Sequence, residues 1–243
     1  MNPGIAFRPL SPQSGKVIRL VLFDIDGTLV HTGGAGVKAF ARALASEFGI
    51  QDGTGQVKFG GRTDVSLVRE IFRNEGIEAS PENFARFFAA YVSCLREIIV
   101  GCKGGACRGV LPFHDDLAAR PQPPLLGLLT GNIQQGARIK LERFQLWEKF
   151  PFGAFADDHE ERDQIAAIAL QRGSRRLGGP LRGDEVLVIG DTPLDIRCGR
   201  SIGAKVLAVA TGGAPLEELR AHQPDWAVAD LSQVSAAEVL DGA

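Results

Sequence analysis

The sequence predicts an α/β protein, with a doubly wound parallel sheet and an inserted all-helical segment. Three observations predict this fold. Short runs rich in Val, Ile and Leu end abruptly in Gly, Asp or Thr, which is typical of buried parallel strands. Amphipathic helical patterns alternate with the later runs, as in a doubly wound sheet. Between the first run and the second, several helical patterns occur without a convincing strand.

The expected core elements follow in chain order. Strands are predicted over residues 17–23, 125–129, 186–189 and 206–209. Helices are predicted over residues 134–144, 162–172 and 194–202, because apolar residues recur there at spacings of three and four. A short strand over 226–228 and a helix over 235–240 complete the core.

The insertion contains three predicted helices, over residues 37–48, 65–72 and 82–100. The first ends at Gly49 and the second at Gly76, and Thr63 or Asp64 is the N-cap of the second. Its aromatic stripe indicates a packed bundle core. We therefore expect a core domain over 17–33 and 109–243, a helical domain over 34–108, hinges near 31–34 and 104–112, and a flexible segment over 1–16.

Composition and charge exclude several classes of protein. Of 243 residues, 44% are apolar and 23% are charged, which is typical of a globular chain. The 27 basic and 29 acidic residues are interspersed, so no electrostatic footprint for nucleic acid or an anionic membrane is expected. No apolar run reaches the about 18 residues of a membrane span, and the N-terminus is unlike a signal peptide. We therefore expect a soluble protein, and four scattered cysteines, too few for a disulfide framework, favour the cytoplasm.

Two acids, Asp24 and Asp26, follow the first predicted strand and precede a turn at Gly27. Side chains two apart on a strand point to the same side, so the two carboxylates can converge. A divalent cation or a shared proton would offset their repulsion. The alternative is a common Asp-Gly turn with solvated or capping carboxylates.

Two further strand ends carry polar residues. Thr130, Gly131 and Asn132 follow the second strand, just before a helix, and form a phosphate-sized anion site. Asp191 and Asp195 follow the third strand, where Asp191 can complete a cage of oxygen ligands. An alternative interpretation as a helix cap applies to Thr130 or Asn132 and to Asp191. Their joint occurrence favours a site, because ligands of open α/β sheets bind beyond the carboxyl ends of the strands.

These residues resemble the motifs of the haloacid-dehalogenase-like (HAD-like) hydrolases, and within that family the phosphoglycolate-phosphatase-like members with a helical cap. The stretch from Asp24 to Thr28 is similar to the first motif, Thr130 to the second, and Gly190-Asp191 with Asp195 to the fourth. The resemblance covers residues 19–210. It implies a Rossmann-type core domain, with the insertion as its cap.

The third motif departs from the family pattern, because no Lys-Pro pair occurs in that interval. Arg162 is the candidate for its basic residue, since arginine stays charged and binds phosphate through two donors. Lys140 and Lys149 are less suitable, because they precede the short strand that the family places before this residue. The alternative for Arg162 is a solvated residue at a helix start.

The resemblance also implies residue roles. Mg²⁺ would be held by the carboxylates of Asp24 and Asp191 and by the backbone carbonyl of Asp26. Asp24 would be the nucleophile, and Asp26 would be the general acid and then the general base. The phosphoryl oxygens would contact a set of three residues: Thr130, Gly131 and Arg162. Around them, Asp195 and Asn132 would orient the direct ligands.

The loop over residues 59–64 resembles a cap loop that reaches the active site, so Arg62 or Thr63 would contact a substrate carboxylate or phosphate. A plain glycine-rich turn capped by Thr63 is the alternative. We expect a Mg²⁺-dependent phosphatase of a small phosphorylated metabolite such as 2-phosphoglycolate. Asp26 and Asp191 argue against dehalogenation at carbon. A phosphosugar mutase and a non-catalytic binding protein remain alternatives, and the oligomeric state is left open.

Overall fold

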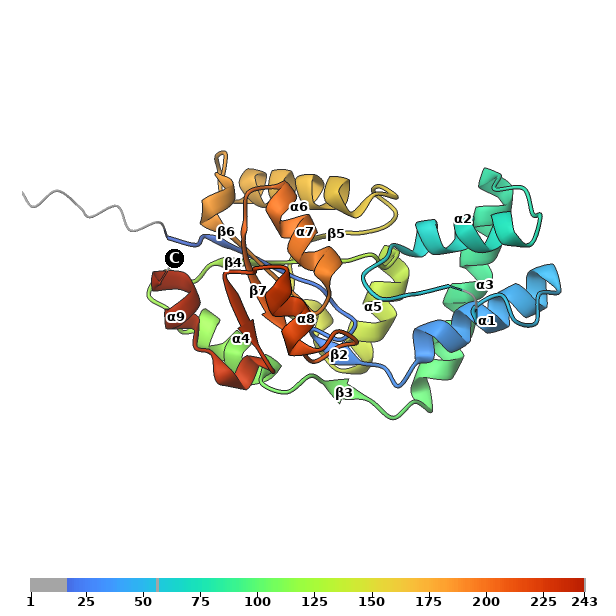
Figure 1. Ribbon diagram of the computed structural model, residues 1–243, viewed down its shortest axis with the longest axis horizontal. Helices are drawn as coiled ribbons and strands as arrows, with labels where there is room; N and C mark the ends of the chain where they lie inside the picture. The colour runs from blue at the N-terminus through green and yellow to red at the C-terminus, as the bar shows by residue number, and fades with distance from the viewer. Residues whose placement is uncertain (1–16, 56, 243) are drawn as a thin grey trace, which may run out of the picture.

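The computed structural model describes residues 17–55 and 57–242, and a six-stranded parallel sheet lies at its centre (Figure 1). The spatial order of the strands is β5-β4-β1-β6-β7-β8. The strands are β1 Leu20–Phe23, β4 Leu125–Leu129, β5 Gly153–Ala154, β6 Val186–Gly190, β7 Lys205–Val209 and β8 Trp226–Val228. This order confirms the predicted α/β fold. Residues 1–16, which we expected to be flexible, lie outside the described residues.

Strand β1 is the middle of the sheet and explains the unbroken apolar run at its start. It pairs in parallel with β4 on one side and β6 on the other. Val21 and Phe23 face one hydrophobic cluster, whereas Leu20 and Leu22 face another. Both faces of the strand are therefore buried, which is why the residues do not alternate with polar ones.

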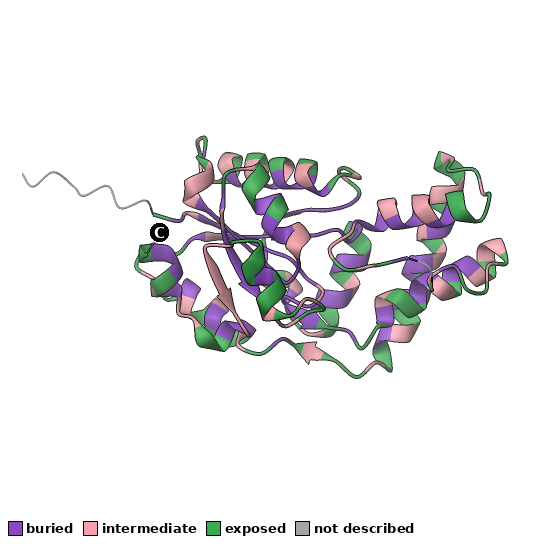
Figure 2. Cartoon of the chain, viewed as in Figure 1, coloured by how far each residue is buried: buried purple, intermediate pink, exposed green. Residues whose placement is uncertain are grey.

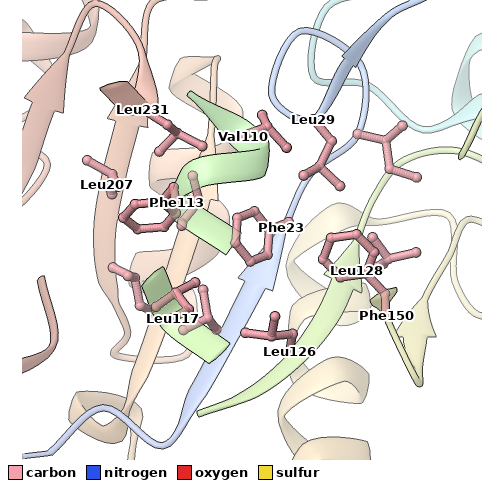
Figure 3. Packing of buried hydrophobic residues seen from close by; sticks show 14 of the residues in the cluster. Phe23, Leu29, Val110, Phe113, Leu117, Leu126, Leu128, Phe150, Leu207 and Leu231 are labelled. Atoms are coloured by element: carbon pink, nitrogen blue, oxygen red, sulfur yellow. The ribbon is translucent and has the colours of Figure 1, made fainter. Parts of the chain in front are cut away.

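Helices cover both faces of the sheet. One layer contains α4 Val110–Ala118, α5 Gln134–Arg143 and α9 Ala236–Asp241, and the other contains α6 Arg162–Arg176 and α7 Pro193–Ser201. The short helix α8 Leu216–Ala221 packs near α7. Figure 3 shows Phe113 and Leu117 of α4 packed near Phe23 of β1. In Figure 2 the central strands are buried along their length, whereas most helices are buried on one side only.

Helix α4 corrects the expected hinge over residues 104–112. The helix begins at Val110, after Gly109 in the left-handed region with φ 85°. Pro112 lies in its first turn, where a proline is tolerated because that backbone N–H has no intrahelical acceptor. Pro112, the last residue of the expected hinge, therefore belongs to a core helix.

The insertion folds into three helices: α1 Ala35–Phe48, α2 Asp64–Asn74 and α3 Pro81–Val100. They lie together at one end of the molecule, away from most of the sheet (Figure 1). Their shared interior is rich in aromatic rings, and Phe40 and Phe72 each contact three other rings. Helix α1 stops at Gly49 in the left-handed region, and Thr63 caps α2 by accepting the Ser66 N–H at 3.2 Å.

Two short strands join the insertion to the core. Strands β2 Val30–His31 and β3 Gly105–Ala106 pair antiparallel, with Val30 opposite Ala106. The expectation that no strand lies between residues 33 and 108 is therefore wrong, because a two-residue strand carries too little pattern to detect. We propose the division into a core over 17–33 and from 109 onward and a helical cap over 34–108. Among the described residues, no helix is long and apolar enough to span a bilayer.

Candidate active site

The carboxyl ends of three adjacent strands bring Asp24, Thr130 and Asp191 to one cavity. Strand β1 lies between β4 and β6, so residues more than 100 positions apart become neighbours. The cavity has a volume of about 450 Å³ and lies between the sheet edge and the cap. Asp26, Gly131, Asn132 and Arg162 also line it, together with residues of α1 and of the cap loop. The expected convergence of the sequence motifs is thus present.

Three buried carboxylates form a compact cluster in this cavity. Oxygen atoms of Asp24, Asp191 and Asp195 all lie within 4.8 Å of one another. Burial raises the pKa of Asp24 to about 7, opposed by Arg162 and reinforced by Asp195. Burial, followed by the charges of Asp195 and Asp24, raises the pKa of Asp191 to about 8. Arg162 therefore does not compensate fully for the burial and mutual repulsion of the three acids, and Asp24 and Asp191 favour their protonated forms when no cation is bound.

Local geometry holds two of these acids in place. The Thr28 hydroxyl donates to Asp191 Oδ1 at 3.0 Å. The backbone at Gly212 passes so close that a Cβ there would lie 1.6 Å from Asp191 Oδ2, so only glycine fits. Asp195 Oδ2 accepts from the backbone N–H and the hydroxyl of Thr192 at 3.0 and 2.6 Å. Thr192 is the N-cap of α7, which leaves Asp191 free of a capping role.

This donor set fits a hard divalent cation. Its ligand atoms are carboxylate oxygens, which Mg²⁺ prefers over nitrogen or sulfur. A cation would replace the protons that these buried acids retain and would offset the repulsion between their deprotonated forms. The Asp26 carboxylate is not part of the cluster, since its Oδ2 faces Lys140 and Asn132. A contribution from Asp26 through its backbone carbonyl stays a prediction.

Arg162 begins α6 and extends into the acidic cluster, with 6% of its side chain exposed. Its Nη2 donates to Asp24 Oδ1 at 2.9 Å and also pairs with Asp195. Although burial opposes its charge, Asp195 and Asp24 raise the pKa of Arg162 above its usual value. Among the described residues, nothing accepts a hydrogen bond from the buried Nε. The solvated alternative for this arginine is therefore wrong.

The loop after β4 presents donors at the same edge. Thr130 Oγ1 accepts from Asn132 Nδ2 at 2.8 Å, so its own proton is available to another acceptor. Asn132 does not cap α5, whose N-cap is Ile133. A Cβ at Gly131 would lie 2.2 Å from the Arg62 carbonyl oxygen, so the glycine allows the cap loop to approach. The Gly131 carbonyl accepts the Asp64 N–H at 2.7 Å.

The two predicted substrate contacts in the cap have different surroundings. Arg62 lines the cavity, but its Nη1 donates to Glu70 Oε2 at 2.6 Å. Thr63 is buried, donates to the Glu160 carbonyl at 2.7 Å and caps α2. Thr63 therefore has the capping role that was one of its two interpretations, and it also joins the cap loop to the core.

Sequence reasoning weighed Lys140 only as a phosphate-binding residue less suitable than Arg162, and it gave Asp64 only a capping role. Lys140 lies on α5, is 4% exposed and donates from Nζ to Asp26 Oδ2 and Asn132 Oδ1, each at 2.6 Å. Asp64 Oδ2 accepts the Ile133 N–H at 2.8 Å, and burial, opposed by Lys140, raises the pKa of Asp64 to about 7. Lys149, the other lysine considered, does not line the cavity.

The chain matches a family model and resembles several known proteins. The family model of the haloacid dehalogenase-like hydrolases matches residues 21–209. The pyrophosphatase PpaX of Halalkalibacterium halodurans is 23% identical over 217 residues, which are 88% of this chain and 94% of that protein. A crystal structure from Haemophilus somnus 129pt, described as a predicted phosphoglycolate phosphatase, is 20% identical with a TM-score of 0.67. It covers 92% of this chain and 96% of that chain.

The structure of CbbY from Rhodobacter sphaeroides in complex with phosphate is 17% identical, with a TM-score of 0.63. It covers 81% of this chain and 87% of that chain. At these identities the two structural likenesses show the fold. The family match, which spans the predicted motifs, shows more: the chain belongs to the haloacid dehalogenase-like hydrolases.

Proposed function

We propose that the protein is a Mg²⁺-dependent phosphatase that hydrolyses a small phosphorylated metabolite through an aspartyl-phosphate on Asp24. The observation that carries this proposal is the cluster of Asp24, Asp191 and Arg162 in one cavity under the cap. A carboxylate nucleophile, oxygen ligands and a buried guanidinium are the groups that phosphoryl transfer requires.

The first step is attack of an Asp24 carboxylate oxygen on phosphorus, with cleavage of the bond to the leaving oxygen. Arg162 supports the transfer, because its charge offsets the negative phosphoryl oxygens and its Nε has a hydrogen bond left to donate. The Thr130 hydroxyl and the Gly131 backbone N–H hold further phosphoryl oxygens. Mg²⁺, held by Asp24, Asp191 and the Asp26 carbonyl, would neutralise charge on the phosphate. Asp195 orients Arg162 through their ion pair.

Asp26 moves the protons in both steps. It donates a proton to the leaving alkoxide, so that an alcohol departs. It then takes a proton from the water that attacks phosphorus in the aspartyl-phosphate, which releases inorganic phosphate and restores Asp24. Its placement supports both roles, because it lines the cavity and its side chain is 43% exposed.

The cap covers the cavity and supplies the surroundings of the leaving group. Phe40 and Phe59 provide apolar wall, and Arg62 is a candidate to contact an anionic group such as the carboxylate of 2-phosphoglycolate. Arg62 would have to exchange its partner Glu70 for the substrate. The cytoplasm is the proposed location, supported by four cysteines that are all free thiols.

The test is hydrolysis by the purified protein, first of an aryl phosphate and then of a panel that includes 2-phosphoglycolate and inorganic pyrophosphate. We expect turnover that requires Mg²⁺ and is lost with EDTA. Quenching with acid during turnover should trap phosphate on Asp24 in the wild type and none in Asp24→Asn. Turnover that continues without a divalent metal would contradict the proposal, and absence of turnover with the whole panel would favour a binding protein.

A further inference from the structure

We propose that Lys140, together with Asn132, is a positioning residue that orients the Asp26 carboxyl group for proton transfer to the leaving group. This inference rests on the proposed function, since it assumes that Asp26 is the acid in phosphomonoester cleavage. It concerns a helix residue ten positions beyond Thr130, outside the four motifs found in the sequence.

The three side chains form a closed triangle of hydrogen bonds. Lys140 Nζ donates to Asp26 Oδ2 and to Asn132 Oδ1, each at 2.6 Å. Asn132 Nδ2 completes the triangle by donating to Asp26 Oδ2 at 2.9 Å. Because the triangle joins the segment after β1, the loop after β4 and helix α5, it connects the carboxyl group to three parts of the core.

Both anchoring donors use the same oxygen of Asp26. Oδ2 accepts from Lys140 and from Asn132, whereas no described residue hydrogen-bonds to Oδ1. Asp26 also keeps 43% of its side chain exposed, although Lys140 is buried. One oxygen is therefore fixed and the other is left for the leaving group. Proton transfer needs this arrangement, since its efficiency depends on a fixed donor-acceptor geometry.

The Lys140 side chain is buried, although it carries a charge. Burying an ammonium group is costly, and its surroundings must compensate for that cost. Helix α1 passes close above it, since a Cβ at Gly36 would lie 3.2 Å from Lys140 Nζ. The fold thus encloses the lysine under the cap, where its ion-pair partner is the Asp26 carboxylate. The ammonium is thus held between the oxygen atoms of Asp26 and Asn132, where it can keep the Asp26 carboxyl group in place.

The inference predicts that the fall in kcat/KM caused by replacing Lys140 depends on the leaving group of the substrate. A nitrophenolate leaves readily without a proton, whereas an alkoxide needs one from Asp26. The ratio kcat/KM reports phosphoryl transfer to Asp24 and not the later hydrolysis of the intermediate. We expect Lys140→Met to lower kcat/KM for an alkyl phosphate by about 10- to 100-fold, within the range that a general acid contributes. The loss for p-nitrophenyl phosphate should be several-fold smaller.

The comparison of two substrates in one preparation controls for folding, because an inactive fraction lowers both values equally. Lys140→Gln, which keeps a polar group, provides a second variant if Lys140→Met does not fold. Arg138→Met is the matched control: this residue lies two positions away on the exposed face of α5 and pairs with Glu142. We expect both of its kcat/KM values to stay near the wild type.

A second measurement uses the Asp26→Asn background. If Lys140 acts through Asp26, adding Lys140→Met to Asp26→Asn should change little for either substrate. Equal losses for both substrates, or a Lys140→Met effect that persists undiminished without Asp26, would overturn the inference. These outcomes leave the proposed function intact. That function fails only if the wild type lacks Mg²⁺-dependent turnover or if Asp24→Asn retains it.

Discussion

The cap interior and the carboxyl edge of the sheet are both buried, but their chemistry is opposite. Between α1, α2 and α3, aromatic and aliphatic side chains fill the space, with Phe40, Phe72 and Phe87 among the fully buried ones. At the sheet edge the buried side chains are ionisable: Asp24, Asp191, Asp195, Arg162 and Lys140. Burial of apolar side chains stabilises the cap interior, whereas removal of charged side chains from water costs free energy at the sheet edge. Function therefore lies where packing is least favourable, and the cap covers that edge.

The largest expected effect is on activity, at the charged edge. Asp24→Asn removes the nucleophile and should lower kcat by about 10⁴-fold or more. The melting temperature should stay equal or rise, because one of the crowded acids loses its charge while the amide oxygen can still accept from Arg162. Steady-state kinetics and thermal denaturation check the two halves. A clear fall in melting temperature would show that the charge at Asp24 stabilises the fold.

The next effect is on stability, in the cap interior. Phe72→Ala removes a fully buried ring that contacts Phe48, Phe84 and Phe87. The free energy of unfolding should fall by about 3–5 kcal/mol. Urea denaturation measures this loss. Phe88→Ala on α3, where the ring is only half-buried, is the matched control with a smaller expected loss. Equal losses for the two would contradict the packing described here.

The protonation of Asp24 and Asp191 at the sheet edge should make the stability of the metal-free protein depend on pH. The pKa of Asp24 is about 7 and that of Asp191 about 8 in the fold, against an ordinary value of 3.8. These acids keep their protons in the folded state after the unfolded chain has lost them. The metal-free protein therefore loses stability as the pH rises from about 4 toward about 8.

Mg²⁺ binds the deprotonated acids, so its stabilisation should grow over the upper part of that range. At about 100 times the dissociation constant, the expected gain is about 2.7 kcal/mol. The measurement is the difference in melting temperature between Mg²⁺ and EDTA, taken at about pH 6 and about pH 8. Asp191→Asn should abolish most of the difference. A larger Mg²⁺ effect at the lower pH would contradict the assignment.

The smallest effect tests the contact between the two regions. Thr63→Ala and Ser80→Ala each remove an N-cap of a cap helix and should each cost about 1 kcal/mol. Thr63 also donates to the Glu160 carbonyl in the core, whereas Ser80 makes no such contact. Only Thr63→Ala should therefore raise KM. Matching kinetics for the two variants would show that this cap contact does not influence substrate binding.

Much of the fold follows from local pattern. The apolar runs and their Gly, Asp or Thr ends identify four strands of the sheet, and the helical periods of the insertion identify α1, α2 and α3. Elements with weak pattern were missed: β3 has two residues, and the start of α4 contains Pro112. Strand β1 begins at Leu20, three residues after the expected start, because pairing with its neighbours determines its bounds.

The candidate site also contains residues that the sequence predicts and one whose contact it does not predict. Asp24, Thr130 and Asp191 follow strands directly, so the topology of a parallel sheet brings them together. Lys140 was judged less suitable because it precedes the short strand. Its contact with Asp26 could not be predicted, because the direction of a long side chain depends on its tertiary surroundings. A signal was present: Lys140 shares a helix face with Gly136, Ala137 and Leu141, all buried. Small residues beside a lysine on an apolar face indicate room for it to point inward.

The paired strands β2 and β3 have a consequence for how the enzyme admits substrate. The chain crosses between cap and core at two places, and backbone pairing of Val30 with Ala106 and of His31 with Gly105 joins them. Two chain connections that are paired with each other allow the cap to rotate about one axis relative to the core, but they resist translation of the cap. The cap would then open and close for substrate entry and product release by rotation about this axis. Each closure would return the loop at Gly61 to Arg162, which also contacts Asp24.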